Sequence, residues 1–171
     1  MKNLTEYIKE GYEYTHKLSK SEQDWVNYNK GKSEVQPKTK KELIKIINDS
    51  FEKGVYDLNF IDTSEITDMS ELFYLGVKLR KFDKSIQKSI NISDWNVSNV
   101  KDMNHMFNKC TYFNCDLSRW DVSNVKDMSY MFQFCYDLNC DLSGWNVSNV
   151  LDMRDMFYGC NKLTIPSWYK K

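Results

Sequence analysis

The chain has 171 residues, of which 41% are hydrophobic, and its 24 Lys and Arg balance its 24 Asp and Glu. This length can bury one hydrophobic core, and the zero net charge argues against broad electrostatic binding to nucleic acid or to an anionic membrane. No apolar run approaches the roughly 20 residues of a membrane-spanning helix, and the sequence after Met1 has no secretory signal, so we expect a protein that is cytoplasmic as encoded.

The first 36 residues are predicted to form a helical arm and a linker. Apolar residues recur at helical spacing over residues 3–19, namely Leu4, Tyr7, Ile8 and Tyr12. Residues 27–37 are polar and include Gly31 and Pro37, which is typical of a linker. The Tyr-rich helix face can extend the cap of the following domain or hold a partner, and the first role is favoured.

Residues 37–54 are predicted to form an N-terminal cap helix. Thr39 followed by Glu42 is a capping box, and Gly54 marks the stop. Between these signals the apolar residues lie on one helical face: Leu43, Ile44, Ile46, Ile47 and Phe51. We therefore expect a helix over residues 38–52.

Residues 55–171 are predicted to be a repeat domain that ends in a C-terminal cap. Four residue types recur every 25 positions: Trp95, Trp120 and Trp145; Met103, Met128 and Met153; Phe107, Phe132 and Phe157; Cys110, Cys135 and Cys160. A degenerate first copy begins near Ile61 and has extra residues over about 76–91. The sequence around Trp168 breaks the register, which is consistent with a cap.

Each copy is predicted to be a short strand followed by a short helix. Trp120 and Val122 alternate with polar residues as in a half-buried strand, whereas Val125, Met128 and Met131 have helical spacing. One such unit cannot bury its apolar side alone, so the copies must stack. The predicted fold class is therefore α/β: a leucine-rich-repeat-like solenoid of about four strand–helix repeats with an N-terminal helical cap.

The repeat W-(N/D)-V-S-N-V-x-D-M-x-x-M-F, followed by C-x-x-(F/L)-N-C-D-L-S, resembles the BspA-like leucine-rich repeats of bacterial surface lipoproteins. The resemblance covers residues 91–165 strongly and 55–90 weakly. It implies a right-handed solenoid with an adhesin-like function in protein binding. It also implies a location at the cell surface if the chain is truncated.

The sequence contains no set of residues that indicates catalysis, and we expect no enzyme activity and no cofactor. His16 and His105 stand alone, and no Gly-rich phosphate loop occurs. Carboxylates recur one copy apart and can be read as a calcium site: Asp68, Asp102, Asp127 and Asp152. Local capping by each carboxylate is favoured, so no metal site is predicted.

The five cysteines fall into two repeat positions. Cys110, Cys135 and Cys160 share a position where a small buried side chain is expected. Cys115 and Cys140 share another, where one disulfide between neighbouring copies is geometrically possible. The odd number of cysteines and the missing signal favour free thiols.

Two surfaces are candidates for partner binding, and either can instead be a solvated face. The first is the outward side of the predicted strands, with Asp94, Asn96, Ser98, Arg119, Asp121, Ser123, Asn146 and Ser148. The second is a basic insertion that can attract an acidic partner, with Lys78, Arg80 and Lys81.

The function predicted from the sequence is a non-catalytic protein–protein interaction module that binds a protein partner through the strand face. We expect a monomer or weak dimer with no nucleic-acid partner and no membrane insertion. The alternative is an intracellular inhibitor or immunity-type protein that uses the arm and the basic insertion to block an enzyme or toxin.

Overall fold

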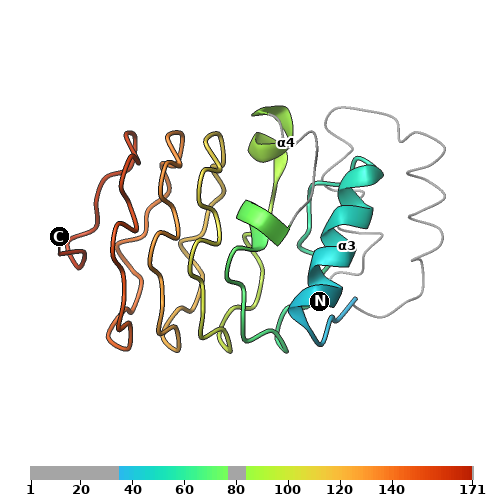
Figure 1. Cartoon of the computed structure of the whole chain (residues 1–171), viewed down its shortest axis with the longest axis horizontal. Coiled ribbons are helices and arrows are strands. Elements are labelled where there is room, and N and C mark those ends of the chain that lie inside the picture. The colour runs from blue at the N-terminus through green and yellow to red at the C-terminus, as the bar shows by residue number, and fades with distance from the viewer. Residues whose placement is uncertain (1–34, 77–83, 171) are drawn as a thin grey trace.

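The computed structural model describes residues 35–76 and 84–170. Its helical elements are α3 (Lys40–Glu52), the π-helical turn η1 (Leu72–Gly76) and α4 (Lys84–Ser89). Figure 1 shows α3 beside a row of stacked coils, with α4 at one edge and the C-terminus at the far end of the row. The predicted arm over residues 3–19 lies outside the described residues.

Helix α3 begins where the sequence places a capping box. The Thr39 side chain accepts a hydrogen bond from the Glu42 N–H at 3.2 Å, and the Glu42 carboxylate accepts one from the Lys38 N–H at 2.7 Å. The residues of α3 that face the coils are buried: Leu43, Ile47, Ser50 and Phe51. Helix α3 therefore covers the apolar core at this end of the stack.

The prediction of a leucine-rich-repeat-like solenoid built from strands and helices is wrong. The described residues contain three short helices and no strand. The β-pairing between successive copies is limited to isolated parallel bridges, at Asp68 with Asp102, Asp102 with Asp127, and Asp127 with Asp152. Each copy is instead an irregular coil of tight turns that lies against the next copy.

Left-handed residues prevent the helix that the apolar spacing predicted. In the coil that contains Met128, Tyr130 has a φ of 58° and Phe134 a φ of 63°, and the equivalent His105 and Lys109 have 54° and 62°. A residue with a positive φ cannot continue an α-helix, because every residue in an α-helix has a negative φ. The spacing of Met128, Met131 and Phe132 therefore arises from successive turns.

These turns leave alternate N–H groups free to bond to the next coil. The N–H groups of Met128, Tyr130, Phe132 and Phe134 donate to carbonyls of the following coil at 2.8–3.0 Å, and those of Met103, His105, Phe107 and Lys109 do the same one copy earlier. The intervening N–H groups close turns within the coil, as from Met131 to the Met128 carbonyl at 3.2 Å. The backbone N–H groups of these coils thus find hydrogen-bond acceptors without strands or helices.

The corners predicted as strands are turns closed by Asp and Asn side chains. The carboxylate of Asp121 accepts a hydrogen bond from the Ser123 N–H at 3.0 Å, and Asp116 and Asp141 accept in the same way from the N–H two residues later, both at 2.9 Å. Asp and Asn favour such turns because their short side chains reach the backbone two residues ahead. The alternation of Trp120 and Val122 with polar residues therefore marks a bend.

Side-chain ladders fill the interior of the stack. The rings of Phe73, Phe107, Phe132 and Phe157 stack at centroid distances of 5.2, 5.4 and 5.9 Å. The indole N–H groups donate to carbonyls of the preceding coil, from Trp95 to Leu58, Trp120 to Ile92, and Trp145 to Leu117, at 2.9–3.1 Å. The repeated Phe rings thus contact one another along the stack, and the repeated Trp side chains make equivalent hydrogen bonds to the preceding coil.

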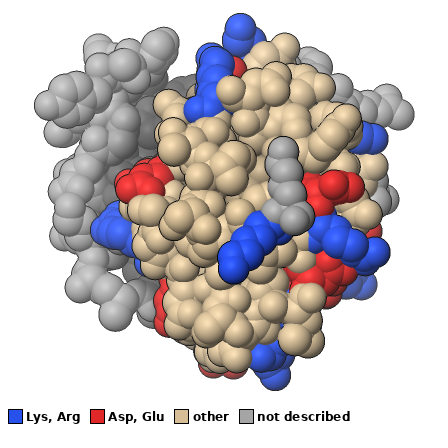
Figure 2. Space-filling model, turned by 90° about the vertical axis from the view of Figure 1, so that its left-hand side faces the viewer, with Lys and Arg blue, Asp and Glu red and all other residues tan. Residues whose placement is uncertain are grey.

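The last residues close the C-terminal end. The Trp168 indole continues the Trp ladder by donating to the Leu142 carbonyl at 2.9 Å. The rings of Trp168 and Tyr169 lie 5.9 and 5.0 Å from that of Phe157, the last ring of the Phe stack. Figure 2 looks onto this end and shows uncharged residues over most of it.

All five cysteines are free thiols, so Cys115 and Cys140 form no disulfide. The thiols of Cys135 and Cys160 each donate to a Phe carbonyl of the preceding coil at 3.0 Å, and the Cys110 thiol does so at 3.7 Å. Burial raises the pKa of the Cys115 and Cys140 thiols to about 11. These cysteines pack in the stack as neutral thiols.

We expect Gly159→Ala to destabilise the protein. Gly159 has a φ of 82°, and an added Cβ would lie 2.9 Å from the Phe134 ring. The left-handed conformation costs a non-glycine residue about 1–2 kcal/mol, and the close contact adds to this cost. Urea unfolding measures the loss.

Gly144→Ala is the matched control for this substitution. A Cβ at Gly144 would have no atom within 4 Å. We expect its effect on the free energy of unfolding to stay below about 1 kcal/mol. Equal losses for the two variants would show that the backbone at Gly159 is not held in the left-handed conformation.

Candidate functional site

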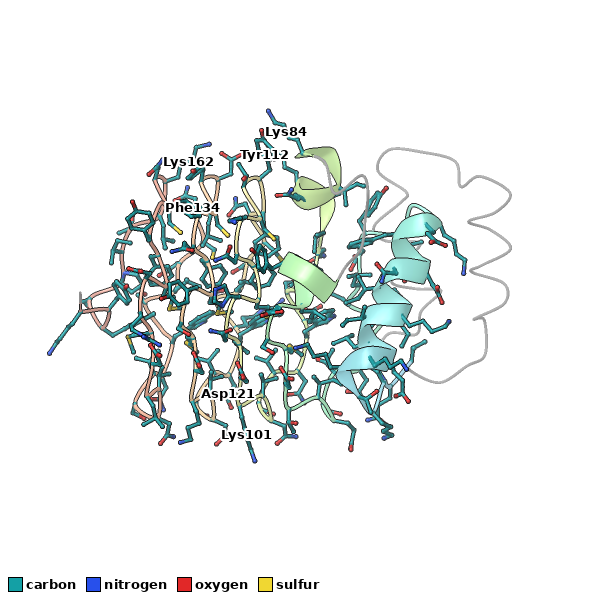
Figure 3. The ribbon with its side chains drawn as sticks, in the orientation of Figure 1. Lys84, Lys101, Tyr112, Asp121, Phe134 and Lys162 are labelled. Carbon is teal, nitrogen blue, oxygen red and sulfur yellow. The ribbon has the colours of Figure 1, made fainter. Side chains whose placement is uncertain are left out.

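The outward residues predicted to bind a partner line one edge of the stack, here called the polar edge: Asp94, Asn96, Ser98, Arg119, Asp121, Ser123, Asn146 and Ser148. Arg119 donates to the Asp94 carboxylate of the preceding coil at 2.5 Å. Figure 3 shows Asp121 and Lys101 along the same edge of the stack. The structure therefore brings these residues together on turns.

Several side chains of the polar edge accept backbone hydrogen bonds within their own turns. The side-chain oxygens of Asn96, Asp121 and Asn146 each accept a hydrogen bond from the Ser N–H two residues later, at 3.0–3.2 Å. The hydrogen bonds from Ser123 hold the pKa of Asp121 below its usual value. These side chains shape the turns, so their recurrence has a structural explanation.

The carboxylates considered for calcium also close local turns. Asp68, Asp102, Asp127 and Asp152 each accept from the N–H two residues later, at 2.7–3.0 Å. Within residues 35–76 and 84–170, no three His, Cys, Asp or Glu side chains form a group suited to a metal ion. The regular spacing of these carboxylates follows from the repeated turn.

The basic insertion cannot be placed. Lys78, Arg80 and Lys81 lie outside the described residues, as does most of the arm. The inhibitor alternative relied on these two segments. No contact in the described part of the chain bears on it.

A side of the stack that sequence reasoning missed carries partly or fully exposed rings, and we call it the aromatic face: Tyr74, His105, Tyr130, Phe134, Tyr136 and Tyr158. The His105 ring stacks on Tyr74 at 6.0 Å and on Tyr130 at 4.7 Å. The Phe134 ring meets those of Tyr136 and Tyr158 edge-on, at 6.2 and 5.4 Å. Tyr136 and Tyr158 remain 42% and 60% exposed.

The left-handed turns hold this face in place. His105, Tyr130 and Phe134 are themselves left-handed residues, and their N–H groups donate across to the next coil at 2.8–3.0 Å. These residues occupy variable positions of the repeat, between the invariant Met, Phe and Cys. An excess of aromatic residues at variable positions was the signal available in the sequence.

A pocket of about 260 Å³ opens beside α4, and we call it the basic pocket. Its lining residues are Lys88, Tyr112, Asn114, Asp137 and Lys162. The Lys162 ammonium lies 2.5 Å from the Asp137 carboxylate, and Lys88 lies 3.7 Å from it. Figure 3 shows Lys84, Tyr112 and Lys162 along the edge of the stack opposite Asp121.

Residues 42–168 match the family described as "Mycoplasma protein of unknown function, DUF285". This match overturns the assignment to the BspA-like leucine-rich repeats, and the surface-adhesin role implied by that resemblance has no support. No curated protein and no solved structure matches the chain. Among the described residues, no helix has the length and apolar character needed to cross a membrane.

Proposed function

We propose that this chain, which belongs to the DUF285 family, is a non-catalytic module that binds a protein partner through its aromatic face. The observation that carries the proposal is a row of partly exposed rings on a backbone that is hydrogen-bonded from coil to coil. Tyr136 and Tyr158 are the most accessible rings of this row.

The chemistry of these rings suits a protein interface. Tyr side chains bury a large area and lose little conformational entropy, and they are enriched among residues that dominate binding energy. Of the large hydrophobic side chains exposed in the described residues, Tyr136 and Tyr158 lie on the aromatic face, whereas Leu151 follows Lys101 and Lys126 along the stack. A partner that covers Tyr136 and Tyr158 would remove apolar area from water.

The polar edge is less suited to the same role. Its Asp and Asn oxygens already accept backbone hydrogen bonds, as in the turn of Asp121 at 3.0 Å. A partner at this edge would have to desolvate ionised carboxylates such as that of Asp121, which costs binding energy unless the partner supplies donors for their remaining lone pairs. The aromatic face therefore replaces the polar edge as the proposed binding surface.

Site-specific photo-crosslinking in cells that produce the protein tests this proposal. A benzophenone amino acid is placed at Tyr158, and the control places it at Asn146 on the polar edge. We expect one discrete protein adduct from position 158 and none of the same mass from position 146. The adduct should decrease when Tyr136→Ser is added, because that change removes a neighbouring contact ring.

Two results would contradict the proposal. One is a common adduct from both positions, which would place the partner elsewhere or show random collision. The other is an adduct at position 158 that Tyr136→Ser leaves unchanged while thermal unfolding shows that the variant is folded.

A further inference from the structure

We propose that the basic pocket binds an anionic monosaccharide, a sugar that carries a carboxylate or a phosphate group. This inference goes beyond the protein-binding function and does not depend on it. It rests on the pocket of about 260 Å³ and on the side chains that line it.

The lysines around the pocket exceed the acidic charge. Among the described residues, the pocket lining contains one carboxylate, that of Asp137, and Lys162, Lys88 and Lys84 all lower its pKa, Lys162 most strongly through its hydrogen bond. The site therefore keeps a net positive charge at neutral pH. The positive charges of these lysines repel one another, and a bound anion would relieve the repulsion.

Two of the three ammonium groups are available to a ligand. Lys162 is engaged by Asp137 at 2.5 Å, whereas Lys88 forms a looser ion pair with the same carboxylate at 3.7 Å, beyond hydrogen-bond distance. The Lys84 ammonium lies over the Tyr112 ring, 5.3 Å from its centroid. Within the described part of the chain, neither Lys84 nor Lys88 donates a hydrogen bond to a carboxylate, so both can donate to an anion.

The other lining groups suit hydroxyls and a sugar ring. The Asn114 side-chain oxygen accepts a hydrogen bond from the Asn139 N–H at 2.9 Å. The NH₂ group of Asn114 can then donate to a ligand hydroxyl. Asp137 stays ionised and can accept hydrogen bonds from hydroxyl groups. Tyr112 supplies an aromatic surface for the C–H face of a sugar. A bare phosphate or chloride would leave these groups unused.

The lining elements are fixed to one another. The Tyr112 N–H donates to the Gln87 side chain of α4 at 2.9 Å, and the Asp137 N–H donates to the Thr111 carbonyl at 3.0 Å. These bonds hold α4 and two successive coils around the pocket. The ligand groups are thus positioned before binding, which lowers the entropic cost of association.

Amide chemical-shift titration of the full ¹⁵N-labelled chain tests the proposal. The probes are glucuronate, glucose 6-phosphate and neutral glucose, each added at constant ionic strength. We expect saturable shifts at Tyr112, Asn114 and Asp137 with at least one of the two anions and none with glucose. The two anions distinguish a carboxylate ligand from a phosphate ligand.

Variants that lack two lysines test whether the anion binds in the basic pocket. Lys84→Gln with Lys88→Gln should weaken binding by about tenfold or more, since charged hydrogen bonds to the anion are lost. The control, Lys101→Gln with Lys126→Gln, removes the same charge on the opposite edge and should leave the affinity within about twofold. No saturable shift with either anion, equal binding of glucose, or equal losses in the two double variants would each overturn the proposal.

Discussion

Trp120→Ala should lower the free energy of unfolding by about 3–5 kcal/mol, as expected for truncation of a large buried aromatic residue. Trp120 is 4% exposed, and its ring lies 6.4 Å from that of Phe107. Its indole N–H also donates to the Ile92 carbonyl at 3.1 Å. The substitution would therefore open a cavity and remove one of the two hydrogen bonds that the Ile92 carbonyl accepts, the other coming from the Trp95 N–H at 3.2 Å. Urea unfolding followed by fluorescence and circular dichroism measures the loss.

Two further variants separate the contributions at this position. Trp120→Phe keeps most of the packing but removes the indole donor, so we expect a smaller loss than for Trp120→Ala. Tyr158→Ala removes a ring that is 60% exposed and should change stability by less than about 1 kcal/mol. A loss for Trp120→Ala no larger than for Tyr158→Ala would contradict the ladder of Trp side chains.

Thiol alkylation of the folded protein should be at least about 100 times slower than alkylation of the urea-unfolded chain. Burial raises the pKa of Cys115 and Cys140 from 9.0 to about 11 and that of Cys160 to about 12. At about pH 8, a rise of the thiol pKa from 9.0 to about 11 lowers the fraction of reactive thiolate about 100-fold. The half-buried Cys140 should react first, and the more deeply buried Cys135 should be among the last.

Iodoacetamide labelling followed by peptide mass spectrometry resolves these rates. All five cysteines should become labelled after unfolding without reductant, because each is a free thiol. Labelling of only three would reveal the disulfide between Cys115 and Cys140 that the structure lacks. Labelling of Cys135 in the folded protein as fast as in urea would contradict its place inside the stack.

The repeat itself could be predicted from the sequence, but its local structure could not. Spacing of 25 residues between Trp120 and Trp145 implies stacking, and these side chains occupy equivalent buried positions. Apolar spacing alone does not distinguish a helix from a series of tight turns, because both place Met128 and Met131 on one side. The left-handed conformation of Tyr130 and Phe134 decided between them, and neither residue type signals it.

The polar residues were misread for a related reason. The Asn124 side-chain amide donates to the Ser98 carbonyl of the preceding coil at 2.8 Å, so it links two coils. Asp121 was assigned to an outward strand position, but its carboxylate closes a turn. An Asp or Asn followed two residues later by Ser fits caps, strand edges and turns alike. Only the contacts between coils distinguish these three possibilities.

The sequence could predict only part of the candidate surfaces. Most residues of the polar edge are exposed, but their recurrence is explained by the turns. The aromatic face depends on bringing His105 and Tyr130, 25 residues apart, into ring contact at 4.7 Å. The basic pocket depends on Lys88, Tyr112 and Lys162, which come from three separate segments. Such long-range contacts follow from the stacking of the coils.

Amide hydrogen exchange by NMR tests the stacked-coil structure beneath the aromatic face most directly. The N–H groups of Met128, Tyr130, Phe132 and Phe134 donate to the next coil at 2.8–3.0 Å, so we expect them to exchange slowly and with similar protection. Slow exchange of all four would establish that coils without strands or helices form the rigid support of that face. Rapid exchange of all four, with protection confined to α3, would contradict it.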